Sequence, residues 1–240
     1  MKLPASWKLP DTIKSRFGQR SLGKQRAMVA DGHLLLVLHQ APQAGDRTRQ
    51  GVLFWRKPDG IWEHSGGSKG LQPLIKHLEA YNQAEEHLRD RYEQAQEAED
   101  YFDVLEAIAP LHLAAQNIHN TLQVARDAIP GDRDLIDLRD WAYEIDRSLV
   151  LLHENTKNAL EYRIAQRAEE QTRLSLEAVQ SSHRLNILAA VFFPLTAISC
   201  IFGMNIASGL ERSSFYTFWL ITLLGVAAGV LVRKWVVGGK

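Results

Sequence analysis

Two long uncharged segments near the C-terminus constrain this 240-residue chain more than any other feature of its sequence. Residues 187–204 read ILAAVFFPLTAISCIFGM and residues 215–232 read FYTFWLITLLGVAAGVLV, eighteen residues each. At about 1.5 Å per helical residue, each segment extends roughly 27 Å, close to the thickness of a bilayer's hydrocarbon core. One such segment could be the buried core helix of a soluble protein. Two in tandem, joined by a short loop, predict a helical hairpin that crosses a membrane twice.

Basic residues around the two segments predict the orientation of this hairpin. Four arginines precede the first segment and three basic residues follow the second: Arg163, Arg167, Arg173, Arg184, Arg233, Lys234 and Lys240. The connecting loop carries only Arg212, which stands beside Glu211. We therefore expect a multi-pass protein of the cell membrane with the loop outside and both termini in the cytoplasm.

The middle of the chain has the composition and the apolar spacing of long helices. Glycine is scarce there, and Pro110 and the Pro130–Gly131 pair are the main breakers. Asp132 is a plausible N-cap. The predicted helices are residues 71–109, residues 111–129 and a third that begins near Asp132.

The third helix has no breaker between Asp134 and Phe193. Its apolar positions keep a three–four spacing through Leu138, Trp141, Ile145, Leu149, Leu152, Thr156 and Ala159. We expect it to run uninterrupted into the first membrane segment, over about 110 Å at 1.5 Å per residue. A rod of this length needs neighbours, so several copies of the chain should pack side by side.

The same stripe continues into the first membrane segment and becomes small or weakly polar. Its members are Ser182, Leu185, Ala189, Phe193, Thr196, Cys200 and Gly203. Small residues let helices pack closely in lipid, and this is one interpretation of the stripe. The other is a narrow pore in which Leu185 and Phe193 form apolar constrictions. The composition of the stripe does not decide between them.

The N-terminal part has the pattern of a small antiparallel sheet. Strands are predicted at residues 26–30, 33–39, 51–57 and 61–64, with turns at Asp31–Gly32 and at residues 58–60. The sequence SGGSKG at residues 65–70 would join this sheet to the helices. The expected fold is therefore a mainly α membrane protein in three parts: a cytosolic β-rich domain at 1–70, a cytosolic long-helix region at 71–185 and a two-helix transmembrane domain at 186–240.

The sequence shows no sign of an enzyme or of a cofactor site. It contains no phosphate-binding loop, nucleophile elbow or HExxH motif. His112 and His119 are seven residues apart, too far to bind one ion together, and are interpreted as packing or surface residues. Cys200 is the single cysteine, which excludes a disulfide within the chain, and 28 basic against 28 acidic residues give no reason to expect nucleic acid.

The segment RLNILAAVFFPLTAISCIFGMN, followed by a short loop, a second apolar segment and a basic tail with Trp235, resembles the CorA family of magnesium transporters. The triplet Gly203–Met204–Asn205, which closes the first of two C-terminal spans, carries the resemblance. It covers residues 132–240 well and residues 71–131 loosely. Two features depart from the family pattern: the loop lacks the Met-Pro-Glu-Leu motif, and the N-terminal domain is short.

The resemblance implies a homopentamer in which the first spans line a central pore. Asn205 would ring the outer mouth, with Gly203 and Met204 shaping the turn, and Leu185, Phe193 and Thr196 match pore positions of the family. Mg²⁺ gives up its waters reluctantly, so a ring of neutral amide oxygens could hold the hydrated ion. Zinc, cobalt or nickel transport remains an alternative, as does a non-conducting membrane-anchored assembly with a regulatory role.

Two sets of carboxylates are further candidates for contact with cations. Glu211 in the connecting loop could concentrate them near the pore mouth. Nine acidic residues lie between 85 and 106, and Glu93, Glu97 and Asp100 have the spacing of one helical face. One hypothesis is that this face binds cytosolic Mg²⁺ against a neighbouring subunit; the alternative is an ordinary solvated surface.

Overall fold

The computed structural model describes residues 3–18, 23–42, 49–203 and 215–238. Its elements, in chain order, are α1 (Asp11–Lys14), β1 (Arg26–Ala30), β2 (His33–His39), β3 (Gly51–Arg56), β4 (Trp62–His64), α2 (Gln72–Gln94), α3 (Ala98–Ala128), α4 (Arg133–Gly203) and α5 (Phe215–Gly238). The chain divides into two compact units, Met1–Ala165 and Gln166–Lys240, and α4 contributes to both. The mainly helical fold with a small sheet and a very long helix is confirmed.

The four predicted strands form one antiparallel sheet in the order β1-β2-β3-β4. Their ends agree with the prediction to within one residue. At the β1–β2 turn, Asp31 and Gly32 have φ angles of 51° and 75°. Two positive φ values are what a tight two-residue hairpin with the right-handed twist of its strands requires, and Asp–Gly is a favoured pair for it.

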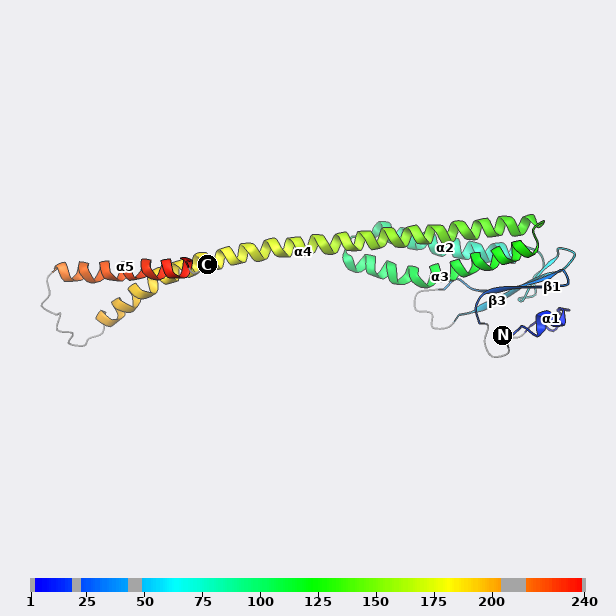
Figure 1. Ribbon diagram of the computed structural model, residues 1–240, viewed down its shortest axis with the longest axis horizontal. Coiled ribbons are helices and arrows are strands. Elements are labelled where there is room, and N and C mark those ends of the chain that lie inside the picture. The colour runs from blue at the N-terminus through cyan, green and yellow to red at the C-terminus, as the bar shows by residue number, and fades with distance from the viewer. Residues whose placement is uncertain (1–2, 19–22, 43–48, 204–214, 239–240) are drawn as a thin grey trace. The chain divides into compact units, whose positions relative to one another are not determined.

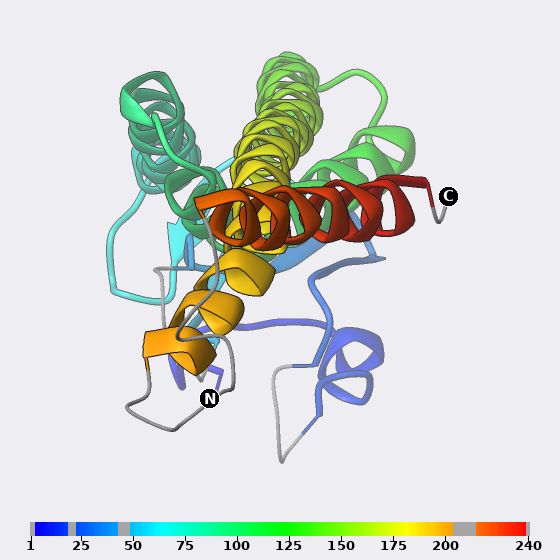
Figure 2. The same cartoon turned by 90° about the vertical axis from the view of Figure 1, so that its left-hand side faces the viewer.

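Alternate residues of the sheet face two different cores. Leu34, Leu36 and Leu38 of β2 pack in the cluster shared with the long helices. Leu35 and Val37 pack with the N-terminal segment around α1. Figures 1 and 2 show this arrangement, with α1 on one side of the sheet and α2, α3 and the first part of α4 on the other. Both faces are covered, so every residue of β2 from Leu34 to His39 is buried.

The prediction of one helix over residues 71–109 is wrong, because α2 ends at Gln94 and α3 begins at Ala98. A capping box makes this break: the Glu97 side chain accepts a bond from the backbone of Asp100, and Asp100 Oδ2 accepts the Glu97 N–H at 2.9 Å. Pro110, the predicted breaker, lies inside α3. Its position is exposed, so water can satisfy the carbonyl that loses its partner.

The start of α4 is confirmed in detail. Asp132 Oδ1 accepts the N–H of Leu135 at 3.2 Å, which is an N-cap bond, and Asp132 Oδ2 pairs with Arg56 of β3 at 2.6 Å. One carboxylate thus caps the helix and fastens it to the sheet. The predicted stripe from Leu138 to Thr156 faces the core, where Leu149 and Thr156 have no exposed surface.

The second unit contains the end of α4 and α5. Residues 166–186 of α4 are all exposed. Within the described residues, one helix, Arg133–Cys200, contains a stretch long and apolar enough to cross a membrane, and Thr222–Leu231 is a shorter apolar stretch. The first predicted membrane segment therefore has the expected helical form.

Candidate functional site

Small residues of α5 pack against the first predicted membrane segment, which is part of α4. A Cβ atom added at Gly229 would lie 2.9 Å from the carbonyl oxygen and 3.2 Å from the Cα of Val191. Gly225 and Gly229 are buried, and Thr222 and Ala228 are half-buried on the same face. Two glycines four residues apart let helix backbones approach closely, and such spacing is a recurrent contact between membrane helices.

This contact covers one face of α4. Five of the half-buried residues here lie on the side of Val191: Ile187, Ala190, Val191, Pro194 and Ile198; a sixth, Ala189, lies on the other side. Phe192, by contrast, is 56% exposed and Leu188 is 53% exposed. The spacing of four, three and four from Ile187 to Val191, Pro194 and Ile198 is that of a single helical face. Both the burial pattern of α4 and the contact at Gly229 therefore place α5 against the Val191 face of α4.

The stripe predicted as a pore lining lies on the opposite face. At about 100° per residue, its members centre roughly 160° around the helix from Val191. Leu185 is 64% exposed and Phe193 is 71% exposed, and Thr196 and Cys200 are also exposed, while Ala189 is half-buried. Within this unit, α5 leaves the stripe open, so another copy of the chain or an aqueous path could meet it.

The chemistry of the stripe is neutral. Thr196 Oγ1 donates to the Phe192 carbonyl at 2.8 Å, so the hydroxyl proton is used and the exposed oxygen can still accept a hydrogen bond. Glu177, paired with Arg173 at 4.0 Å, is the last acidic residue before the segment, and the sequence has no carboxylate between 178 and 210. The stripe could guide a hydrated cation, but it offers no charged ligand that would hold one.

Three predicted site residues lie outside the described part of the chain: Met204, Asn205 and Glu211. Gly203, the first residue of the triplet, is the last residue of α4. The roles assigned to Gly203, Met204 and Asn205 stay predictions, as does that of Glu211.

The three acidic residues considered for a regulatory site do not share one helical face. Glu93 belongs to α2, Glu97 is the N-cap of α3 and Asp100 lies in the first turn of α3. The backbone N–H groups of Glu97 and Gln96 donate to Asp100 and hold the pKa of its carboxyl below its ordinary value. No group of three or more metal-binding side chains is found in the described residues. The geometric premise of the regulatory site is therefore wrong.

The structure adds a partner for the two histidines of α3. Asp146 of α4 lies between them, with Oδ1 at 3.5 Å from His112 Nε2 and Oδ2 at 3.5 Å from His119 Nδ1. Tyr143 packs against the His119 ring. The sequence could not reveal this cluster, because Asp146 comes from another helix. It lies where α3 meets α4, in keeping with a packing role for both histidines.

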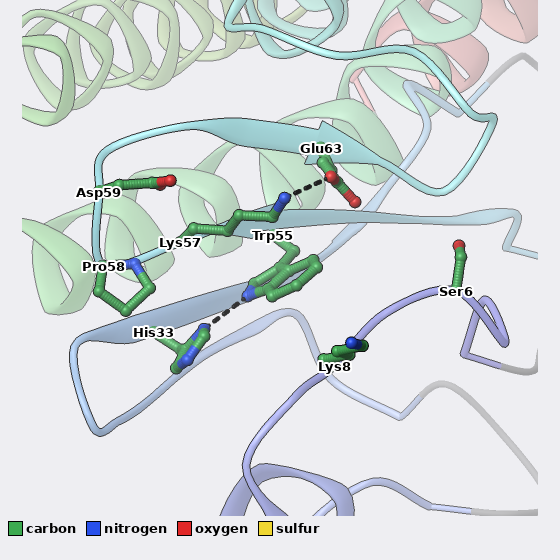
Figure 3. Close-up of a pocket in the computed structure, with 8 residues that line it drawn as sticks. All are labelled: Ser6, Lys8, His33, Trp55, Lys57, Pro58, Asp59 and Glu63. Carbon is green, nitrogen blue, oxygen red and sulfur yellow. Dashed lines mark hydrogen bonds and ion pairs between the residues drawn. The ribbon is translucent and has the colours of Figure 1, made fainter.

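One cavity of about 500 Å³ opens beside the outer face of the sheet, between the N-terminal segment and the β3–β4 hairpin (Figure 3). Its charged groups are largely compensated within the chain: Lys57 pairs with Glu63 at 2.7 Å and lies over the Trp55 ring. The Trp55 indole donates to His33 Nδ1 at 3.1 Å. Lys8 and Asp59 are exposed and can be solvated, so the cavity presents no unbalanced buried group.

No family model and no curated protein matches the chain. Among solved structures, that of the full-length CmaX protein is similar over 97% of this chain and 81% of CmaX, with a TM-score of 0.58 and 13% identity. The CorA magnesium transporter from Methanocaldococcus jannaschii matches over 92% of this chain and 80% of the transporter, with a TM-score of 0.38 and 16% identity. The likeness to CmaX concerns the fold alone. The second likeness is too low to support an argument.

Proposed function

We propose that the chain forms a passive channel or transporter for divalent metal cations, with Mg²⁺ as the first candidate. The protein would span the membrane twice, with both termini in the cytoplasm, and assemble as a homopentamer. The membrane potential would drive uptake, since a divalent ion gains about 4.6 kcal/mol across 100 mV.

The observation that carries this proposal is the face of α4 that α5 leaves open. It bears small and weakly polar residues, and it lies opposite the Gly229–Val191 contact. In a ring of subunits with α5 outside, this face would turn toward the axis. Lipid-facing helices are usually apolar around their exposed side, whereas Thr196 and Cys200 are exposed here.

Asn205 is proposed as the residue that meets the ion. One amide oxygen from each subunit would accept hydrogen bonds from the waters of hydrated Mg²⁺, so the ion need not be dehydrated. A neutral ring binds more weakly than a ring of carboxylates, and weak binding favours release into the pore.

The exposed part of α4 supports an assembly. Tyr162, Leu174, Leu176 and Val179 are each more than half exposed in the single chain. Neighbouring copies would cover these apolar side chains. Native mass spectrometry of the purified protein should show a pentamer; a stable monomer or dimer would contradict the proposed assembly.

Phe193 is proposed as an apolar constriction, and Leu188 offers a matched control. Both are large apolar side chains, 71% and 53% exposed, but Phe193 lies on the stripe and Leu188 lies about 100° around the helix from the centre of the stripe. Phe193→Ala should raise ion leak at low driving force, and Leu188→Ala should not. Equal leak in the two variants would count against this gate.

The decisive experiment is ion flux into liposomes that contain the purified protein, with Mg²⁺ and Zn²⁺ compared. Uptake of Mg²⁺ that follows the imposed potential is the expected result. Preference for zinc, cobalt or nickel would keep the channel and change the ion. Absence of flux in correctly assembled protein would favour the non-conducting alternative, which the missing Met-Pro-Glu-Leu motif of the connecting loop also supports.

A further inference from the structure

A second cavity, of about 350 Å³, lies between α2 and α3 in the first unit. Its apolar lining comes from Pro42, Ala84, Leu88, Ala107 and Leu111. Leu88 and Leu111 are only 5% and 2% exposed, so they form its floor. Binding sites for small molecules typically combine such an apolar floor with a few polar groups at the rim.

The rim carries two polar side chains of α2, His87 and Arg91. Arg91 is half-buried, and among the residues described it has no ion-pair or hydrogen-bond partner. Arg89, two residues earlier, shows the contrast: it pairs with the buried Glu85 at 2.6 Å and donates to Ser148. No nitrogen of Arg91 is among the buried side-chain atoms that lack a partner, so the guanidinium stays accessible and is available to pair with a ligand that enters the cavity.

We propose that this cavity binds an amphiphilic anion, namely a medium-chain carboxylate whose tail lies on the Leu88–Leu111 floor and whose head pairs with Arg91. The planar guanidinium can donate two parallel bonds to a carboxylate, and His87 can donate a third. At about 30 Å³ for each small group, the cavity has room for roughly a dozen non-hydrogen atoms, which suits an eight-carbon acid.

The surrounding charges restrict where the head can lie. Asp90, Glu93 and Asp103 are nearby in sequence and exposed, so water screens them. The carboxylate of the ligand can contact Arg91 without approaching these acidic side chains, because Arg91 lines the cavity and they do not. The cavity of Figure 3 offers no comparable unpaired cation at Lys57, because Glu63 already neutralises that side chain.

The test uses the full chain in phosphatidylcholine nanodiscs and an octanoate probe with a diazirine at its tail. Crosslinked peptides are located by mass spectrometry, and labelling of α5 by probe dissolved in lipid serves as the internal reference. We expect labelling of α2 and α3 around the cavity, displaced by octanoate at least tenfold more effectively than by octanol. Arg91→Gln should weaken binding about tenfold to a hundredfold, because a charge-assisted bidentate pair is lost.

Lys76→Gln is the matched control, since it removes one positive charge from an exposed position of α2 outside the cavity. Ala107→Phe should abolish labelling by filling the space; if circular dichroism shows that it does not fold, the Arg91→Gln comparison decides. Three results would overturn the proposal: no labelling of α2 and α3 above the lipid reference, equal competition by octanol and octanoate, or equal binding by the Arg91→Gln and Lys76→Gln variants. Ion flux is not measured, so the outcome is independent of the proposed transport.

Discussion

The two units of this chain differ in how far they bury the apolar side chains of α4. In the first unit, Leu149 of α4 is completely buried among the helices and the sheet. In the second unit, Leu174 of the same helix is 53% exposed, and Phe193 is 71% exposed. The same helix, α4, therefore has its apolar side chains covered by the rest of the chain in the first unit and left exposed in the second. The proposed membrane span and assembly would account for this difference, since lipid and further copies would cover the exposed side chains of the second region.

The largest expected effect tests what the second region does. Asn205→Ala should abolish Mg²⁺ uptake into liposomes, because alanine has no acceptor for the waters of the ion, and assembly should be unchanged. Asn158→Ala, the same change at an exposed position of α4 in the first unit, should transport normally. Normal uptake by the Asn205 variant would mean that the amide only caps a helix end.

The contrast in burial predicts a contrast in stability. Leu149→Ala should lower the free energy of unfolding by about 2–5 kcal/mol, the usual cost of a cavity in a packed core. Leu174→Ala should cost far less in a dissociated chain and should mainly weaken assembly. Urea titrations at low and high protein concentration would separate the two effects. A large cost for Leu174→Ala that is independent of concentration would remove the distinction between the units.

Local signals explain which parts of the fold could be predicted. The strands are predicted from the Asp–Gly and Pro–Asp–Gly turns between apolar segments, and α4 is predicted from the N-cap at Asp132 and the regular stripe that follows it. Both kinds of signal act within a few residues. The break between α2 and α3 is predicted at Pro110, whereas it occurs at the capping box of Glu97 and Asp100. A proline on an exposed helix face loses one hydrogen bond, whereas a capping box supplies two at a helix start.

The site was predictable only where one helix carries it. The stripe of α4 follows from helical spacing, and the structure adds that it points away from α5. The cluster of His112, His119 and Asp146 depends on how α3 packs on α4, which no spacing within one helix reveals. The same holds for the cavity at Arg91, because its walls come from two helices and a loop.

A buried histidine makes the first unit sensitive to acid. Burial lowers the pKa of His77 from 6.5 to about 4, and its ring packs between Phe54 and Tyr81. Burial also lowers the pKa of His64, and burial with the Arg49 charge lowers that of His39. The neutral forms are favoured in the folded state. The free energy of unfolding is therefore highest above about pH 6.5 and falls as the pH drops toward 4. The loss due to His77 is roughly 3 kcal/mol.

His77→Phe should flatten this dependence, because phenylalanine suits the aromatic surroundings and cannot take up a proton. The urea midpoint of the first unit's transition, followed between pH 7 and 4, measures the effect. His183→Phe, at an exposed position of α4, should leave the pH dependence as it is. An unchanged slope in the His77 variant would show that other groups cause the acid sensitivity.

The smallest effect is expected where the second unit does pack within the chain. At Gly229 a Cβ would lie 2.9 Å from the backbone oxygen of Val191, and neither backbone can yield without separating the helices. Gly229→Leu should therefore weaken the α4–α5 hairpin by about 1–3 kcal/mol, the usual cost of overpacking. Ala227→Leu, on an exposed face of α5, is the control. Titration with SDS in mixed micelles, followed by circular dichroism, would compare the two variants. If both variants unfold at the same SDS concentration, the close approach at Gly229 does not stabilise the hairpin. The placement of α5 on the face of α4 opposite the stripe would then lose its main support.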